Sequence, residues 1–504
     1  MTDSTTLSDA QSDAQITARN HAAKRVIFFT VFLDLLGFGI IIPQLGVYAA
    51  QYGASPFVVG VLAATYSAMG FLFTPFWGRL SDRIGRRPVL LISIFGTALG
   101  YILFAFSHSL VLLFAARVVD GITGGNISVA QAYLSDVTPP AERAKTFGMF
   151  GAIFGIGFAI GPAVGALISY LPGAWGGNLG LGLITAALSF INWAMALKRL
   201  PETLPPAVRE ENNRLANGRR VQIINISGFQ RAFRLPAMGI ILWISLFATV
   251  AFATLQGTYT LFLITRYIRP DVQTYISQNT DSAVAEARRD TADSGATAGL
   301  SGGESTVELS STDEPYPKSM GGDWNLNRAA PQGWTWTRVE KELVRPRATR
   351  MAAWIFAAIG LTALVVQGGL VGKLKKHFSE VNLVIAGTLM MALGLIIVPI
   401  PKNVALEFPV MMLLAFGNSI STPILTALVS ELAPENERGE IMGVFQSVAN
   451  LGRIIGPIVG GSLFLRFSPG MPYFAGAAIM MLSFFMALKL RAVCPNGDCS
   501  PAPV

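Results

Sequence analysis

The sequence predicts an all-α membrane protein of twelve transmembrane helices, arranged as two pseudo-symmetric six-helix bundles. Only 13% of its 504 residues are charged, against roughly a quarter in an ordinary soluble domain. The apolar residues gather in blocks of about twenty, the length that crosses a hydrocarbon core roughly 30 Å thick. A sequence repeat relates the second six blocks to the first, so both bundles are expected to share one architecture.

The chain begins with a polar tail, residues 1–25, rich in Ser, Thr, Asp and Gln. This composition predicts disorder, and the tail lacks the apolar core of a signal peptide. The first apolar block is therefore expected to remain as a membrane helix. Gly, Pro and charged residues separate six blocks that form an N-terminal bundle, 26–197, with spans near 26–48, 56–77, 89–107, 109–135, 144–168 and 176–197.

A basic, polar linker, 198–235, leads into a second bundle, 236–491, and a short tail, 492–504, follows it. Cys494 and Cys499 lie in that tail without a neighbouring histidine, so no metal site is expected. The spans of the second bundle are predicted near 236–265, 351–372, 381–400, 405–430, 440–466 and 470–491.

A long insertion, 266–350, separates the seventh span from the eighth. Its acidic and basic residues nearly balance, and its Gly/Ser/Thr-rich middle, 294–312, predicts disorder. Loops of this length are usually either functional or disordered. We interpret the insertion as a spacer or lid, and keep as an alternative the external domain of a sensor.

Basic residues mark the cytoplasmic side of a membrane protein. Lys and Arg cluster in the two tails and in the loops on the same side, whereas the short opposite loops carry only Lys402 and Arg466. Both termini and the linker are therefore expected in the cytoplasm, with the chain crossing the cell's inner membrane many times. The net charge of +8 follows from this topology and requires no nucleic acid.

The internal repeat keeps one fixed offset. Residues 135–143 (SDVTPPAER) correspond to 430–438 (SELAPENER), and Gly148 to Gly443, Gly161–Pro162 to Gly456–Pro457 and Gly165 to Gly460 follow at that offset. A weaker echo relates 78–87 to 368–377, where Gly372 replaces Asp82. Duplicated halves suit alternating access, in which two bundles rock about a solute site between them. An intact charged network is expected in the first half only.

Four motifs resemble one family. Residues 78–88 (GRLSDRIGRRP) match the loop signature of the major facilitator superfamily nearly position by position, and 117–121 (RVVDG) resemble its fourth-helix arginine motif. Residues 157–166 (GFAIGPAVGA) resemble the fifth-helix motif of antiporters, with Ala166 where glycine is usual. Residues 32–43 (FLDLLGFGIIIP) are similar to drug:proton antiporters, including tetracycline efflux proteins. The resemblance covers both bundles but not the insertion, which is long for this family.

This resemblance implies a gate and a coupling site. Asp82, Arg86 and Asp136 would form an ion-pair latch that holds one conformation, with Asp82 also able to face a helix N-terminus. The same loop signature contributes Gly78, Arg83, Gly85 and Arg87. In the family, the arginine at Arg117 is thought to respond to protonation of a nearby acid, for which Asp34 is the candidate.

Charged residues inside the spans are candidates in their own right. A carboxylate in mid-span costs roughly 2.5–3.5 kcal/mol, so Asp34 is interpreted as a protonation or substrate-cation site, or alternatively as a structural acid. Arg117 and Asp120 lie three residues apart and can neutralise each other on one helix face. Helical spacing also joins Arg117 to a polar stripe that suits a water-filled cavity: Gly121, Gly124, Ser128 and Gln131.

Glycines mark two helices for close packing. Gly157, Gly161 and Gly165, next to Pro162, repeat every four residues, and Gly452, Gly456 and Gly460 do the same in the second bundle. Arg453 stands where the first half has Phe158, and either binds an anionic group or pairs with an acid. Polar and aromatic residues of the second bundle are further candidates to line a solute site: Trp243, Gln256, Tyr259, Asn418, Gln446 and Asn450.

Together these features predict a proton-coupled exporter of a hydrophobic or amphipathic compound. Two alternatives remain: a proton symporter for a metabolite, and a membrane sensor that uses the insertion. We find no catalytic constellation and no phosphate-binding Gly-Lys-Ser/Thr loop, so neither enzymatic activity nor ATP-driven transport is expected. The expected partners are the small-molecule substrate, protons and the lipid bilayer, without a cofactor, metal or nucleic acid, and the protein is expected to be a monomer.

Overall fold

The computed structural model describes residues 3–124, 126–139, 142–206, 209–210, 236–268, 270, 344–433 and 438–493, and for 3–21 it describes the helix alone. Within these ranges the chain forms helices joined by short turns. The segments 211–235 and 271–343, and the tail with Cys494 and Cys499, lie outside the described residues. The expectations for the linker, the insertion and the cysteines therefore remain predictions.

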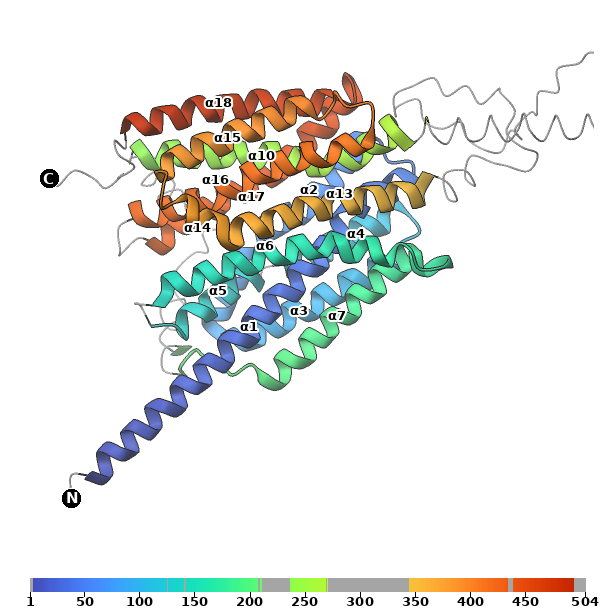
Figure 1. The fold of residues 1–504 in the computed structure, drawn as a ribbon. Coiled ribbons are helices and arrows are strands. Elements are labelled where there is room, and N and C mark those ends of the chain that lie inside the picture. The colour runs from blue at the N-terminus through green and yellow to red at the C-terminus, as the bar shows by residue number, and fades with distance from the viewer. Residues whose placement is uncertain are drawn as a thin grey trace, which may run out of the picture.

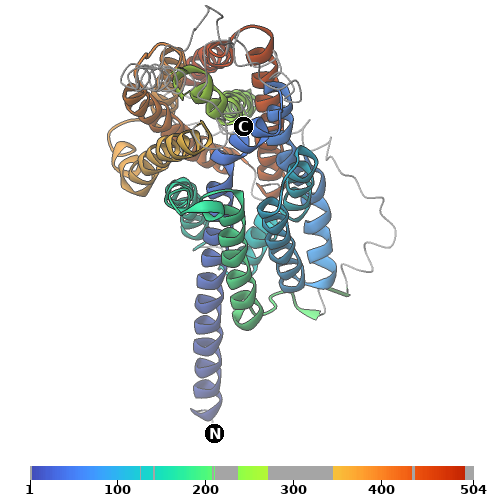
Figure 2. The same cartoon turned by 90° about the vertical axis from the view of Figure 1, so that its right-hand side faces the viewer.

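The first half contains the helices expected for an N-terminal bundle. They are α1 (Asp3–Gln51), α2 (Pro56–Ile84), α3 (Arg86–Ala105), α4 (Leu110–Thr123), α5 (Asn126–Asp136), α6 (Arg143–Ile168) and α7 (Asn178–Arg199), with a 3-10 turn, η2 (Gly173–Gly176), before α7. α1 differs from the prediction because it is helical from Asp3, where a disordered tail was expected, and its first part extends beyond the bundle (Figures 1 and 2). No Gly or Pro precedes Gly37, so nothing interrupts the helix.

The fourth span is described as α4, which ends at Thr123, and α5, which begins at Asn126, with residue 125 outside the described residues. Neighbouring helices donate to two backbone carbonyls at the end of α4. Trp77 Nε1 donates to the carbonyl of Ile122 at 2.5 Å, and the Ser93 hydroxyl donates to that of Thr123. Within a membrane, neighbouring side chains can pair backbone groups at a helix end in this way.

The second half repeats the arrangement. It contains α10 (Pro236–Leu263) with a π-helical end, η3 (Ile264–Ile268), then α13 (Arg345–Val365), continued by η6 (Val366–Leu370) and α14 (Val371–Leu374), then α15 (Glu380–Ile397), η7 (Val404–Leu406), α16 (Glu407–Leu432), α17 (Arg438–Arg466) and α18 (Met471–Val493). Of the described helical segments, eleven are long and apolar enough to span a membrane. α6 adds a further helix of 26 residues at the expected place. The predicted fold class is confirmed.

The packing shows the pseudo-symmetry that the repeat predicts. α1 packs on α6 as α10 packs on α17, and α1 packs on α7 as α10 packs on α18. α3 packs on α4 and α7 as α15 packs on α16 and α18. Across the halves, α2 lies against α17 and α6 against α13. In Figure 1 the first half, blue to green, lies below the second, light green to red.

The hydrophobic core divides between two ends of the molecule. We call the end with Ile84, Arg199 and Val493 the tail end, and the end with Gln51 and Ile268 the insertion end. One apolar cluster lies at the insertion end and contains residues of both halves, such as Tyr48 and Tyr259. At the tail end each half has a cluster of its own. The halves therefore share a core at one end and separate toward the other.

Contacts at the insertion end hold the halves together. Thr260 donates to the carbonyl of Pro43 at 3.0 Å, Gln44 donates to that of Thr349 at 3.3 Å, and Trp354 Nε1 donates to the Tyr170 hydroxyl at 3.3 Å. The Arg350 guanidinium also lies 4.4 Å from the centre of the Tyr170 ring. A side chain at Gly60 of α2 would collide with the backbone of Pro457 of α17. This end is closed.

Glycines on the facing helices report a different environment at the tail end. A Cβ built at any of them would meet no atom of the described residues within 4 Å: Gly78 of α2, Gly368, Gly369 and Gly372 of the eighth span, and Gly443 of α17. These helices touch at the insertion end, so their glycines would be expected to pack if the halves also met at the tail end. The structure is therefore closed at the insertion end and open at the tail end.

Candidate functional site

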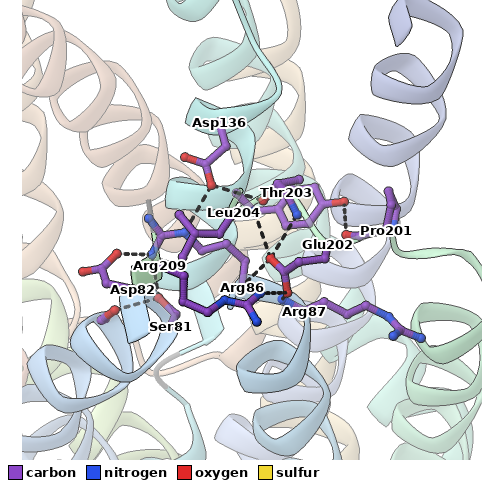
Figure 3. Close-up of polar contacts among 12 residues, drawn as sticks. Ser81, Asp82, Arg86, Arg87, Asp136, Pro201, Glu202, Thr203, Leu204 and Arg209 are labelled. Atoms are coloured by element: carbon purple, nitrogen blue, oxygen red, sulfur yellow. Dashed lines mark hydrogen bonds and ion pairs between the residues drawn. The ribbon is translucent and has the colours of Figure 1, made fainter. Parts of the chain in front are cut away.

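The predicted latch is assembled around Arg86, as Figure 3 shows. Its guanidinium donates to Asp82 at 2.5 Å, to Asp136 at 3.1 Å and to the Ser81 hydroxyl at 2.7 Å. Asp82 lies in the last turn of α2, Arg86 begins α3 and Asp136 ends α5, so one side chain ties three helices of the first half together. The expected group of Asp82, Arg86 and Asp136 is thus brought together, and these three contacts all lie within one half.

Glu202, which the sequence analysis did not identify, completes this network. Its carboxylate accepts from the backbone N–H groups of Arg86 and Arg87 at 3.0 and 3.2 Å, and also from those of Thr203 and Leu204. Two of these donors open α3, so Glu202 caps that helix and complements its dipole. Its position directly after Pro201, next to the last turn of the sixth span, was the available signal.

The remaining residues of the loop signature differ in their surroundings. Gly85 has φ +109°, which favours glycine, and a side chain there would meet Glu202. Arg87 donates to the carbonyl of Leu197 at 2.8 Å, which joins α3 to the end of α7. Arg83 is exposed. Gly78 faces the open space described above.

The predicted charges inside the spans lie near one another in the first half. Arg117 Nη1 is 3.1 Å from Asp120 Oδ2, and both side chains are 2% exposed. Asp34 of α1 is buried. Asp34, Asp120 and Arg117 all act electrostatically on the hydroxyls of Tyr66 and Tyr101. Neither tyrosine was predicted, since an aromatic residue in a span is not distinguishable from packing by sequence.

The Arg117–Asp120 pair is incomplete. Arg117 Nε and Nη2 are buried without a hydrogen-bond partner among the described residues. A buried donor without a partner is costly. A further acceptor close to this guanidinium would therefore lower its free energy. That property suits a residue that changes partner during transport. Gln131, the last member of the predicted polar stripe, is half-buried on α5.

The antiporter-type motif positions the helix that carries Asp34. A Cβ at Gly161 would lie 2.6 Å from the Cα of Gly39, and one at Gly157 would lie 2.7 Å from the Cβ of Leu35. Gly165 faces the backbone of Ile40 in the same way. Together with Pro162, whose ring lies near Gly39, these glycines place α6 directly against α1. Their packing role is as predicted.

Arg453 is a predicted site residue that lies inside a span of the second half. Its Nη1 donates to the Asn450 side-chain oxygen at 2.9 Å, and its charge reaches Tyr66 of the first half. It lies on α17, which packs against α2 of the first half.

A second buried carboxylate, Glu407, was also missed. It is fully buried at the start of α16 and accepts from the hydroxyls of Tyr259 and Tyr267 at 3.1 and 2.6 Å. Tyr259, proposed from the sequence as a solute-site residue, is instead fully buried in the shared core. Glu407 lies within a predicted span, but its place near the span's end made it resemble a residue of the connecting loop.

Two related six-helix halves, closed at one end and open at the other around buried charges, define a secondary active transporter. The family comparison agrees. A model of the Major Facilitator Superfamily matches residues 27–274 and 347–497. The chain belongs to this superfamily.

Similar proteins support the same class. The chain is 27% identical to the tetracycline resistance protein, class C, of Escherichia coli, over 92% of this chain and 96% of that one. It is 25% identical to major facilitator superfamily domain-containing protein 10 of Bos taurus, over 93% and 92% of the chains. The structure resembles that of the human organic anion transporter MFSD10 (TETRAN) with a TM-score of 0.55 and 19% identity, over 93% of this chain and 99% of that one. That last likeness supports the fold alone.

Proposed function

We propose that this protein is a proton-coupled antiporter that exports a hydrophobic or amphipathic compound by alternating access. The observation that carries the proposal is the burial of Asp34, Arg117 and Asp120 inside spans of the first half, which shares an apolar core with the second half at the insertion end. Related proteins named for tetracycline resistance support the direction of transport.

The orientation is part of the proposal. Basic residues concentrate at the tail end, so this end would face the cytoplasm. The conformation described above would then receive substrate from the cytoplasm or the inner leaflet. Rocking of the halves would close the tail end and open the insertion end.

The latch around Arg86 would act in the second conformation. The Asp82 side chain is 45% exposed although it pairs with Arg86, and it lies at the tail end of α2. The N-terminus of the neighbouring helix, α17, lies at the same end. Closure would bring the carboxylate toward this helix terminus, where a negative charge is favourable. Asp82 would thereby stabilise the state that is closed to the cytoplasm.

Proton coupling would be the task of Asp34 and Arg117. When Asp34 is ionised, a cationic compound or a proton can compete for it, which gives exchange. When it is protonated, the unpartnered donors of Arg117 lose an attractive charge and the group can rearrange. The proton gradient and the membrane potential supply the energy, at about 2.3 kcal/mol per charge per 100 mV.

The test is transport in everted membrane vesicles with an imposed pH gradient. Tetracycline and ethidium uptake would be compared for the parent, Asp34→Asn, Arg117→Ala and the exposed control Arg466→Ala. The parent and the control should accumulate a compound when the gradient is applied, and the other two variants should not. Unchanged coupled flux in Asp34→Asn, or no movement of either compound in the parent, would reject the proposal.

A further inference from the structure

Arg453 is a cation inside a membrane span of the second half. It lies in the middle of α17 and is surrounded by protein, yet part of its surface remains accessible. Among the described residues it forms no ion pair, and its hydrogen bond goes to the neutral Asn450. Arg117, the comparable arginine of the first half, has Asp120 at 3.1 Å. An unneutralised charge at this depth is costly and is usually retained for function.

The helix face that carries Arg453 leads to the open tail end. Gly443, Gln446, Asn450 and Arg453 follow one another at intervals of three or four residues, and each retains accessible surface. This spacing places them on one face of α17. Beyond Arg453 the face ends at Pro457, against which Gly60 and Gly257 are packed. Arg453 is thus the innermost polar residue of this face before the closed end.

The N–H donors of Arg453 and Asn450 suit an anionic ligand group. A guanidinium presents a planar fork of N–H groups that matches a carboxylate, sulfonate or phosphate. Because the Asn450 oxygen accepts from Arg453, its NH₂ group remains to donate to the same anion. Arg453 lies on α17 of the second half, whereas Asp34 and Asp120 lie on α1 and α4 of the first half. An anionic group would therefore be held on the side of the second half.

We propose that Arg453 and Asn450 bind the anionic group of the transported compound. The inference rests on the proposed function, and it narrows the substrate class to amphipathic compounds that carry a carboxylate, sulfonate or phosphate. A compound that also carries an amine would place it toward Asp34. The proton would then compete with the amine for Asp34. The anionic group would add substrate selectivity without altering the coupling to protons.

The test uses two compounds that differ only in a carboxylate: 3-(2-naphthyl)alanine and 2-(2-naphthyl)ethylamine. Binding would be measured by calorimetry on the full-length protein in vesicles of phosphatidylcholine, whose headgroups carry no net charge. The parent should bind the amino acid at least about tenfold more tightly than the amine. Arg453→Gln should remove this preference, Asn450→Ala should reduce it, and the exposed control Arg466→Ala should keep it.

Several outcomes would overturn the proposal. A parent with no preference for the carboxylate, or one that binds neither compound, contradicts it, and so does a preference that survives in Arg453→Gln. If Arg453→Gln does not fold, Asn450→Ala and Arg453→Lys decide, because both must weaken the preference. Competition by added phosphatidylglycerol would assign the site to a lipid headgroup instead. A carboxylate preference without proton-driven flux would reject the proposed function and leave this site standing.

Discussion

The two halves of the molecule pack their helices in the same way but differ in the placement of their charged residues. Each half packs its helices in the same pairs. At the tail end of the first half, Arg86 and Glu202 join Asp82, Asp136 and the start of α3. At the corresponding turn of the second half Gly372 replaces Asp82. Repeated packing therefore preserves the architecture, while the polar chemistry has diverged between the halves.

The buried charges show the same divergence. The first half holds the buried Arg117–Asp120 pair on α4 and the buried carboxylate of Asp34 on α1. In the described part of the second half, Arg453 has no acidic partner, and Glu407 accepts from two tyrosines. We infer that the first half is specialised for coupling and gating, and that the second contributes substrate contact and a fixed core. The following predictions test that division.

The largest effect is expected from Glu407→Ala. The substitution leaves the buried hydroxyls of Tyr259 and Tyr267 without the carboxylate that accepts from them, although Tyr267 keeps the carbonyl of Pro401 at 2.9 Å. The unsatisfied buried donors and the cavity left by the side chain should lower the free energy of unfolding by about 2–4 kcal/mol. Thermal unfolding of the purified protein in detergent should show a clearly lower midpoint.

Glu407→Gln is the matched control, because its side-chain oxygen still accepts one hydrogen bond. It should unfold between the parent and Glu407→Ala and should retain proton-driven flux. A loss of coupling in a well-folded Glu407→Gln would show that the second half also carries protons. The proposed division of labour would then be wrong.

A smaller effect is expected from Gly161→Val, compared with Gly443→Val on the other half. Gly161 lies against Gly39 of α1, where even a Cβ would be 2.6 Å from the Cα of Gly39, so overpacking should cost about 1–3 kcal/mol. Gly443 faces open space, so its substitution should leave thermal unfolding close to that of the parent. Equal destabilisation by both would contradict the open tail end.

Gly443→Val should instead reduce flux. Closure of the tail end would bring α2 and α17 together where they are now apart, and an added side chain would obstruct that approach. The comparison of unfolding with transport in the same vesicles separates the two effects. Full flux in this variant would mean that the tail end does not close around Gly443.

The sequence was sufficient for the features that depend on local pattern. Hydropathy located the spans, because lipid demands continuous apolar blocks, and the loop motif brought Asp82, Arg86 and Asp136 together as expected. The close contact of Gly161 with α1 also followed from small residues at helical spacing. The prediction of disorder at the start of the chain was wrong, because α1 is helical from Asp3. A polar composition does not exclude a helix when Gly and Pro are absent.

Other features depend on tertiary position, which the sequence pattern does not contain. Glu202 caps α3, which begins more than a hundred residues earlier, and its position after Pro201 at the end of the sixth span does not indicate which helix it caps. Glu407 and Tyr259 are separated by 148 positions. The opening at the tail end is a property of how two rigid halves are placed, so no residue pattern within either half predicts it.

The smallest effect is expected from Glu202→Ala, compared with Glu380→Ala at the tail end of the second half. Loss of the Glu202 carboxylate removes the acceptor for the Arg86 and Arg87 amides and should cost about 1 kcal/mol, as for other helix caps. Glu380 forms an ion pair with Lys375, which is partly exposed, so its loss should cost about 0.5 kcal/mol or less. Hydrogen exchange should show faster exchange at the start of α3 in Glu202→Ala, with α15 of Glu380→Ala little changed. Equal exchange at both helix starts would mean that the charged network of the first half adds no local order, and that the difference between the halves lies in the buried charges alone.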